Sequence, residues 1–245
     1  MLTWPHARGD WATHLDAVEQ VYLQLAQAIC PHELLLVICD DLEHQQHVQH
    51  LLATAEITPS RIRFALQASN DGWARDHGPI TVIENGQPHL LDFQFNGWGG
   101  KYPHDLDNRI TAGLHAAGIF GTTALESLEL VLEGGSIEPD GQGTLLTTTS
   151  CLRNPNRNPE LSNENIEKIL SDQLGIKRIL WLEHGHLEGD DTYGHIDTLA
   201  RFCSQDTIVY SHCDIPEDSH FESLSAMAEE LAAFKTSAGK PYRLL

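Results

Sequence analysis

Residues 190–197 read D-D-T-Y-G-H-I-D, a segment that places His195 and Asp197 after a predicted strand. Two earlier motifs share this design: W-A-R-D-H-G-P at 73–79 contains Asp76, and L-E-G-G at 132–135 contains Glu133. Each motif follows or ends an apolar run and carries glycine beside a charged residue. Asp76 lies 57 residues before Glu133, and Glu133 lies 62 residues before His195. Such near-equal spacing indicates a repeated unit whose strand ends converge on one centre.

Helices and strands alternate without a linker, so the sequence predicts one α/β domain over residues 1–245. Asn85-Gly86 predicts a type I′ hairpin turn between two strands. The first predicted helix has its apolar positions at Leu15, Val18, Tyr22, Leu25, Ala26 and Ile29. The predicted helices cover residues 10–29, 41–55, 107–117, 163–174 and 217–234. The predicted strands cover residues 34–39, 61–66, 80–84, 88–95, 128–132, 144–149, 177–182, 196–202 and 207–210.

The composition fits a globular protein and argues against several kinds of partner. Apolar residues make up 41% of the chain, and no apolar run approaches the roughly 20 residues of a membrane span. The N-terminus has neither a basic flank nor an apolar signal core. Five cysteines without a CxxC pair indicate reduced thiols and predict a cytoplasmic protein. The net charge of −20 argues against nucleic acid as a partner and is compatible with a small cationic substrate.

The charged motifs carry residue types that suit a planar cation. A guanidinium is permanently charged and presents its donors in a fork that matches carboxylates, which Asp76, Glu133 and Asp197 could supply. If residues 196–202 are extended, His195 and Asp197 point to the same face, because a strand has a period of two. Histidine is the usual proton carrier near neutral pH, and Glu133 could orient it. A single carboxylate at a strand end is more often a cap or a surface group, so the argument depends on all three together.

A metal site is the main alternative from residue types alone. Glu183, His184 and His186 precede Asp190 and His195, which makes a dense set of potential ligands. The spacing that follows H-G-H does not match a binuclear hydrolase, because Glu188 and Gly189 stand where a ligand pair is required. The sequence therefore predicts no metal and no cofactor. A metal hydrolase centred on His184, His186 and His195 stays as the less favoured alternative.

Six motifs resemble the agmatine deiminase and bacterial peptidylarginine deiminase family of the guanidino-modifying (pentein) superfamily. They are T-W-P-H at the start, W-A-R-D-H-G-P, D-F-Q-F-N-G-W-G-G-K, L-E-G-G-S with G-Q-G-T-L-L-T-T, N-R-N-P, and D-D-T-Y-G-H-I-D-T-L-A-R-F. The resemblance implies a pentein-type α/β propeller of five ββαβ repeats with the site on its axis. It also implies hydrolysis of a guanidino group to a ureido group with release of ammonia, most simply agmatine to N-carbamoylputrescine.

The resemblance assigns roles to named residues. It implies that Asp76 and Asp197 bind the guanidinium, that Glu133 binds it and pairs with the histidine, and that His195 is the acid and base. It implies that Trp73 and Asp191 line the pocket. Tyr193 departs from the family, because many members have aspartate there. This departure leaves agmatine, arginine and peptidylarginine open as substrates.

A second departure concerns the nucleophile. The family's attacking cysteine lies in a G-G-G-x-x-H-C-x-T segment, which the 245 residues do not contain. His212-Cys213 copies the H-C pair but lacks the glycines, so Cys213 is expected to be a strand-end residue. The expectation is therefore an incomplete, C-terminally truncated propeller that turns over little or no substrate. Its exposed strand edges should make the chain self-associate, and homo-oligomers are one form that this association can take. A guanidinium-binding remnant without chemistry is the alternative.

Overall fold

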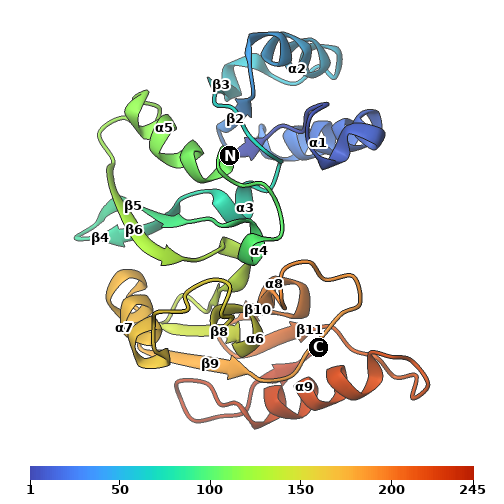
Figure 1. Cartoon of the computed structure of the whole chain (residues 1–245), viewed down its shortest axis with the longest axis vertical. Coiled ribbons are helices and arrows are strands. Elements are labelled where there is room, and N and C mark those ends of the chain that lie inside the picture. The colour runs from blue at the N-terminus through green and yellow to red at the C-terminus, as the bar shows by residue number, and fades with distance from the viewer. The chain divides into compact units, whose positions relative to one another are not determined.

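The computed structural model describes residues 1–245, coloured along the chain in Figure 1, and confirms an α/β protein with small sheets. The chain forms two compact units. The first comprises Met1–Phe95 and Pro103–Leu128, and the second comprises Asn96–Tyr102 and Glu129–Leu245. Four three-stranded sheets form the framework. No helix is both long enough and apolar enough to cross a membrane.

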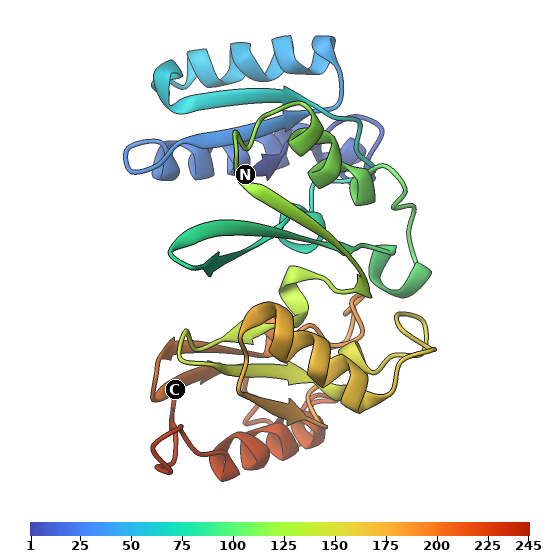
Figure 2. The same cartoon turned by 90° about the vertical axis from the view of Figure 1, so that its left-hand side faces the viewer.

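The first sheet is parallel, and the two helices that connect its strands cover one face of it. Its strands are β1 (Leu2–Thr3), β2 (Leu35–Cys39) and β3 (Ile62–Leu66), and α1 (Leu15–Ile29) and α2 (Leu42–Thr54) connect them. Leu23 of α1 and Val48 of α2 belong to one buried cluster with Val37 of β2, so both helices cover the same face of this sheet, in the blue part of the chain in Figure 2. The side chain of Asp41 caps α2 by accepting a hydrogen bond from the amide of His44.

The apolar face of α1 was predicted with one position misplaced. Leu25 is 41% exposed, whereas Leu23 is buried in the core with Trp4 and Val37. The buried stripe also includes Glu19, whose carboxylate accepts a hydrogen bond from the Trp4 indole at 3.1 Å. A polar residue therefore occupies a buried helix position because it has a partner there.

The second sheet contains the predicted hairpin. Its strands are β4 (Ile80–Glu84), β5 (Gln87–Gln94) and β6 (Ala124–Val131), and the helix α5 (Ile110–Ala116) lies between β5 and β6 in the chain. Asn85 and Gly86 have φ values of 50° and 77°, which is the left-handed conformation that a type I′ turn requires at both central positions. The hairpin prediction is confirmed.

The third and fourth sheets repeat one connectivity. In each, two antiparallel strands are followed by a helix and by a third strand that pairs parallel with the second. The third sheet has β7 (Glu138–Pro139), β8 (Thr144–Thr148), α7 (Asn163–Leu174) and β9 (Arg178–Leu182). The fourth has β10 (Ala200–Ser204), β11 (Thr207–Tyr210), α9 (Phe221–Ala233) and β12 (Arg243–Leu244). The ββαβ order that the family resemblance implies is present in both.

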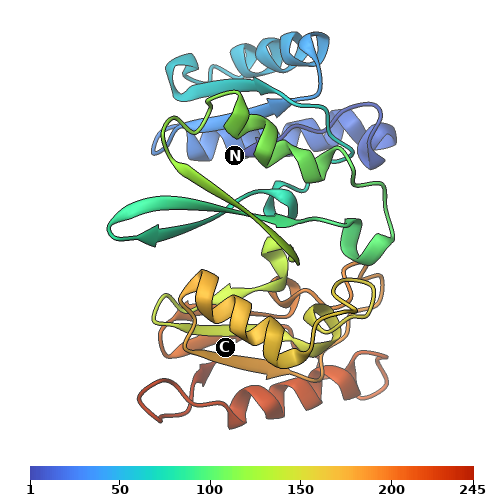
Figure 3. The ribbon, with the colours of Figure 1, turned by 60° about the vertical axis from the view of Figure 1, so that its left-hand side comes forward.

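The core of the second unit lies between these sheets and α9. Leu224, Met227 and Leu231 on one face of α9 pack against Leu182 of β9 and Ile208 of β11. Figure 3 shows α9 running alongside this part of the unit. Burial of these side chains stabilises the strands that lie next to the charged motifs. The stabilisation is roughly 25 cal/mol for each Å² of apolar surface removed from water.

The predicted strand over residues 196–202 is wrong in its first half. Residues Ile196–Leu199 form a helical turn, α8, and only then does β10 begin. The carbonyl of His195 accepts from the hydroxyl of Thr198 at 2.9 Å, which closes the turn. His195 and Asp197 therefore do not share a strand face, since residues two apart on a helix point in different directions. His195 is buried, and Asp197 is half-buried.

Candidate active site

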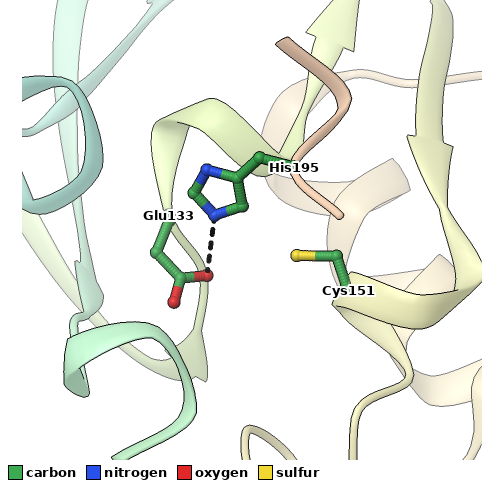
Figure 4. Close-up of side chains that lie close together, drawn as sticks. All are labelled: Glu133, Cys151 and His195. Atoms are coloured by element: carbon green, nitrogen blue, oxygen red, sulfur yellow. Dashed lines mark ion pairs between the residues drawn. The ribbon is translucent and has the colours of Figure 1, made fainter. Parts of the chain in front are cut away.

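Glu133 and His195 meet in the interior of the second unit. Glu133 follows β6 and precedes a short 3-10 turn, Gly134–Ser136, while His195 begins α8. The Nε2 atom of His195 lies 3.9 Å from Oε2 of Glu133 (Figure 4), which is an ion-pair distance when the ring is protonated. Their exposed fractions are 0% and 2%. This pair confirms that the last two motifs converge, and it places a carboxylate where it can orient a histidine.

A buried arginine holds Glu133. The Nε atom of Arg157 donates to both carboxylate oxygens of Glu133, at 3.1 and 2.9 Å, and both side chains are fully buried. The guanidinium also donates to the carbonyl of Thr192 at 2.7 Å and to that of Cys151 at 3.4 Å. Arg157 therefore joins three segments: the end of β6, the turn α6 (Thr149–Leu152) and the loop that leads to His195.

These contacts keep Glu133 ionised despite its burial. Burial acts to raise the pKa of Glu133, but the neighbouring His195 and Arg157 side chains outweigh it and hold the pKa below its usual value. A carboxylate that stays charged in a dry site can stabilise a protonated imidazole beside it. The pair is therefore suited to proton transfer, with His195 as the carrier.

Cys151 completes this cluster, although the sequence analysis did not select it. It lies on α6, and its thiol points toward the other two side chains (Figure 4). One donor atom each from Glu133, Cys151 and His195 lie within 4.8 Å of one another. Burial raises the pKa of the Cys151 thiol, and the neighbouring His195 and Arg157 side chains oppose that effect only in part. The sequence feature that could have indicated Cys151 is its position just after β8, because the charged motifs were also expected to follow strands.

The loop before His195 is fixed by its own hydrogen bonds. The carboxylate of Asp190 accepts from the amides of Thr192 and Gly194. Burial acts to raise the pKa of Asp190, but these hydrogen bonds hold it below the usual value. The carbonyl of Gly194 accepts from the Thr148 hydroxyl at 2.6 Å, and the amide of His195 donates to the Thr192 hydroxyl at 2.9 Å. His195 is thus positioned by its backbone as well as by Glu133.

Tyr193, the departure noted in the sequence, lies within the same loop. Its φ is 64°, and the ammonium of Lys101 lies 3.7 Å from the centre of its ring. Lys101 also donates to the carbonyl of Asp191 at 2.7 Å. The side-chain amide of Asn156 donates to the Tyr193 hydroxyl at 3.3 Å. The side chain of Asp191 is exposed, so its predicted part in a substrate pocket stays a prediction.

The first charged motif belongs to the first unit. Asp76 is buried on α3 (Ala74–His77), and Trp73 precedes that helix with 44% of its surface exposed. The Trp73 indole donates to Asp71 at 2.9 Å. The carboxylate of Asp107 accepts from the amides of Asn70 and Asp71, which fixes the loop before Trp73. Trp73 is thus held by a local network, and the roles of Asp76 and Trp73 with substrate stay predictions.

The histidines considered for a metal hydrolase have other partners. His184 pairs with Glu230 at 2.7 Å near the surface, while His195 is buried beside Glu133. The potential metal ligands that the structure does bring together are Glu133, Cys151 and His195. The ligand set of His184, His186 and His195 therefore gains no support.

The whole chain, residues 1–245, matches the sequence model of the Porphyromonas-type peptidyl-arginine deiminase family. Agmatine deiminases of Stutzerimonas stutzeri and Pseudomonas syringae pv. tomato are 34% and 32% identical to the chain over 98% of its length. The chain spans 64% and 65% of these two relatives, which is just under two thirds of their lengths.

Solved structures resemble this one closely. A structure of C. jejuni agmatine deiminase with substrate bound has a TM-score of 0.89 at 36% identity, covering 100% of this chain and 69% of that one. The agmatine deiminase of Enterococcus faecalis has a TM-score of 0.87 at 28% identity, covering 99% and 66%. The similarity therefore extends over both compact units.

Proposed function

Because this chain belongs to the Porphyromonas-type peptidyl-arginine deiminase family, we propose that it serves in the hydrolysis of a guanidino group. The observation that carries the proposal is the buried Glu133–His195 pair with Arg157 bound to Glu133. The proposed substrate is agmatine and the product N-carbamoylputrescine, since the relatives described above are named agmatine deiminases. Arginine and peptidylarginine follow from the name of the family model as the alternatives.

The reaction needs groups that hold a cation and move protons. A guanidinium and one water become a ureido group and an ammonium ion, so the departing nitrogen gains two protons in all and the water loses both of its protons. His195 can serve both steps in turn, as acid and then as base. Glu133 stabilises the charged imidazole and carries charge opposite to that of the substrate. In a dry site these interactions are stronger than they are in water.

The other assignments rest on the family resemblance. They are Asp76 and Asp197 as guanidinium ligands, Trp73 and Asp191 as pocket residues, and the thiol of a G-G-G-x-x-H-C-x-T segment as the nucleophile, which forms a thiouronium intermediate that water opens. The same resemblance supports the ββαβ sheets as blades of a five-bladed propeller. The proposal concerns the activity of the whole protein.

Product analysis tests this function. The protein, at the length at which it occurs in the cell, is supplied with agmatine, free arginine and an arginine peptide, and ammonia and ureido product are measured. We expect turnover of one of the three, with a loss of roughly 10²–10⁴-fold in His195→Asn, which is the usual range for a general acid–base group. Turnover of none of them, or a wild-type rate in His195→Asn, would overturn the proposal. Binding of agmatine without product would point to the guanidinium-binding remnant.

A further inference from the structure

Cys151 is a buried thiol that the proposed reaction does not use. It lies on α6 with no exposed surface, and its sulfur lies within 4.8 Å of a ring nitrogen of His195 and a carboxylate oxygen of Glu133. The amide of Cys151 donates to the Thr148 hydroxyl at 3.2 Å, and its carbonyl accepts from Arg157, so its backbone is held on both sides. The position of the sulfur beside an imidazole and a carboxylate is therefore well defined.

We propose that Cys151, His195 and Glu133 form a site for a thiophilic divalent cation such as Zn²⁺. The three side chains offer sulfur, nitrogen and oxygen, which are the donors that zinc takes in proteins. Their donor atoms lie within 4.8 Å of one another. Bond lengths of about 2.0–2.3 Å separate tetrahedral ligands by roughly 3.5 Å, so side-chain movements of roughly 1 Å bring all three onto one ion. A water molecule would fill the fourth position.

Arg157 can stay bound to Glu133 while Glu133 also binds a metal ion. Its Nε atom donates to both oxygens of Glu133, and each carboxylate oxygen keeps a further lone pair for a metal. Ligating carboxylates are commonly hydrogen-bonded in this way. The guanidinium also repels a nearby cation, which weakens binding relative to a structural zinc site. The site therefore suits a cation that exchanges, and it differs from the histidine set weighed in the sequence.

Metal binding at this site releases one proton and leaves a small net charge. The Cys151 thiol loses its proton to solvent as the sulfur–metal bond forms, and the neutral His195 ring supplies a lone pair. Glu133, Arg157, the thiolate and a divalent ion then sum to a charge of +1. The occupied His195 nitrogen can no longer accept a proton, so the cation inhibits the proposed reaction. Inhibition rests on the proposed function, whereas cation binding does not.

Cobalt gives a direct test, because a thiolate–Co²⁺ bond has a near-ultraviolet charge-transfer absorption. The purified whole protein is titrated with Co²⁺, and Zn²⁺ is then added. We expect the absorption to saturate at one equivalent and to vanish as Zn²⁺ displaces Co²⁺. Cys151→Ser should abolish it, and Glu133→Gln should weaken cobalt binding at least tenfold. Cys203→Ser is the matched control, since Cys203 is exposed on β10 and should leave the titration unchanged.

Two results would overturn the site. One is an absorption that persists in Cys151→Ser, and the other is an absorption that is lost in Cys203→Ser. Circular dichroism of each variant shows whether it is folded, and Glu133→Gln gives a second test that keeps the thiol. Cobalt binding through Cys151 in a protein that lacks deiminase activity would support this site. That result would refute only the proposed function.

Discussion

At the scale of single residues, Arg157 determines the charge of the Glu133–His195 pair. Glu133 and His195 could be predicted from sequence because each lies beside glycine in a motif that follows an apolar run. Arg157 and Cys151 could not, because their contacts with Glu133 and His195 join residues 24 and 44 positions apart in the chain. Nothing in the N-R-N-P motif itself indicates which carboxylate the arginine meets. Such pairings depend on how separate strands and turns pack.

Replacing Arg157 should therefore be strongly destabilising. Arg157→Gln leaves the buried carboxylate of Glu133 without its counter-charge, and we expect the free energy of unfolding to fall by about 3–5 kcal/mol. Urea unfolding at neutral pH measures the change. Lys168→Gln removes a cation from an exposed i,i+4 pair with Asp172 and should change stability by only about 0.5 kcal/mol. Equal losses in the two variants would show that Arg157 is not required in this way.

Because His77, at the end of α3, is buried, the free energy of unfolding should depend on pH. Burial lowers its pKa from 6.5 to about 4, so the unfolded chain binds the proton more readily than the folded chain between these values. The stability from a neutral His77 is therefore present above pH 6.5 and is lost as pH falls toward 4. Asp107, whose pKa burial raises to about 6, acts in the opposite sense.

A comparison with His77→Gln isolates this contribution. We expect the difference in unfolding free energy between wild type and variant to shrink by about 3 kcal/mol from pH 7 to pH 4. Asp107 is present in both proteins, so its effect cancels from the difference. Denaturant midpoints measured across this range supply the data. A difference that does not change with pH would mean that His77 titrates normally.

At the scale of elements, local signals predicted most helices and strands. The helix α7 begins and ends at the predicted residues, because the side chain of Ser162 caps its start and Gly175 ends it in the left-handed conformation. The turn α8 was missed because its four residues, I-D-T-L, carry no helical period. Its conformation comes from bonds to the preceding loop, which the sequence pattern does not show.

The segment Asn96–Lys101 holds the loop before His195, and two glycines test this contact. Gly99 and Gly100 have φ values of 81° and 79°, so alanine is strained at both. A Cβ on Gly99 would lie 3.0 Å from the Tyr193 ring, whereas one on Gly100 meets nothing within 4 Å. We expect Gly100→Ala to cost about 1 kcal/mol of unfolding free energy and Gly99→Ala clearly more. Equal thermal midpoints for the two variants would show that the contact does not matter.

At the scale of the whole molecule, the repeat was predictable and its details were not. Motifs at near-equal spacing indicated repeated units, and two sheets of the second unit share the ββαβ order. The parallel first sheet departs from that order, with α1 and α2 between its strands. Spacing reports the period of a repeat, whereas strand direction depends on connections that apolar patterns do not encode.

The central claim is that Glu133, held by Arg157, supports guanidino hydrolysis through His195. The most direct measurement is kcat/KM for agmatine in Glu133→Gln beside Glu138→Gln, using the whole protein. Glu138 is also buried and also pairs with an arginine, the half-exposed Arg201, at 2.7 Å, so it controls for the loss of a buried carboxylate that binds an arginine. The account predicts a loss of at least roughly 10²-fold in Glu133→Gln and a change of a few-fold in Glu138→Gln. Equal kcat/KM in the two variants would contradict it.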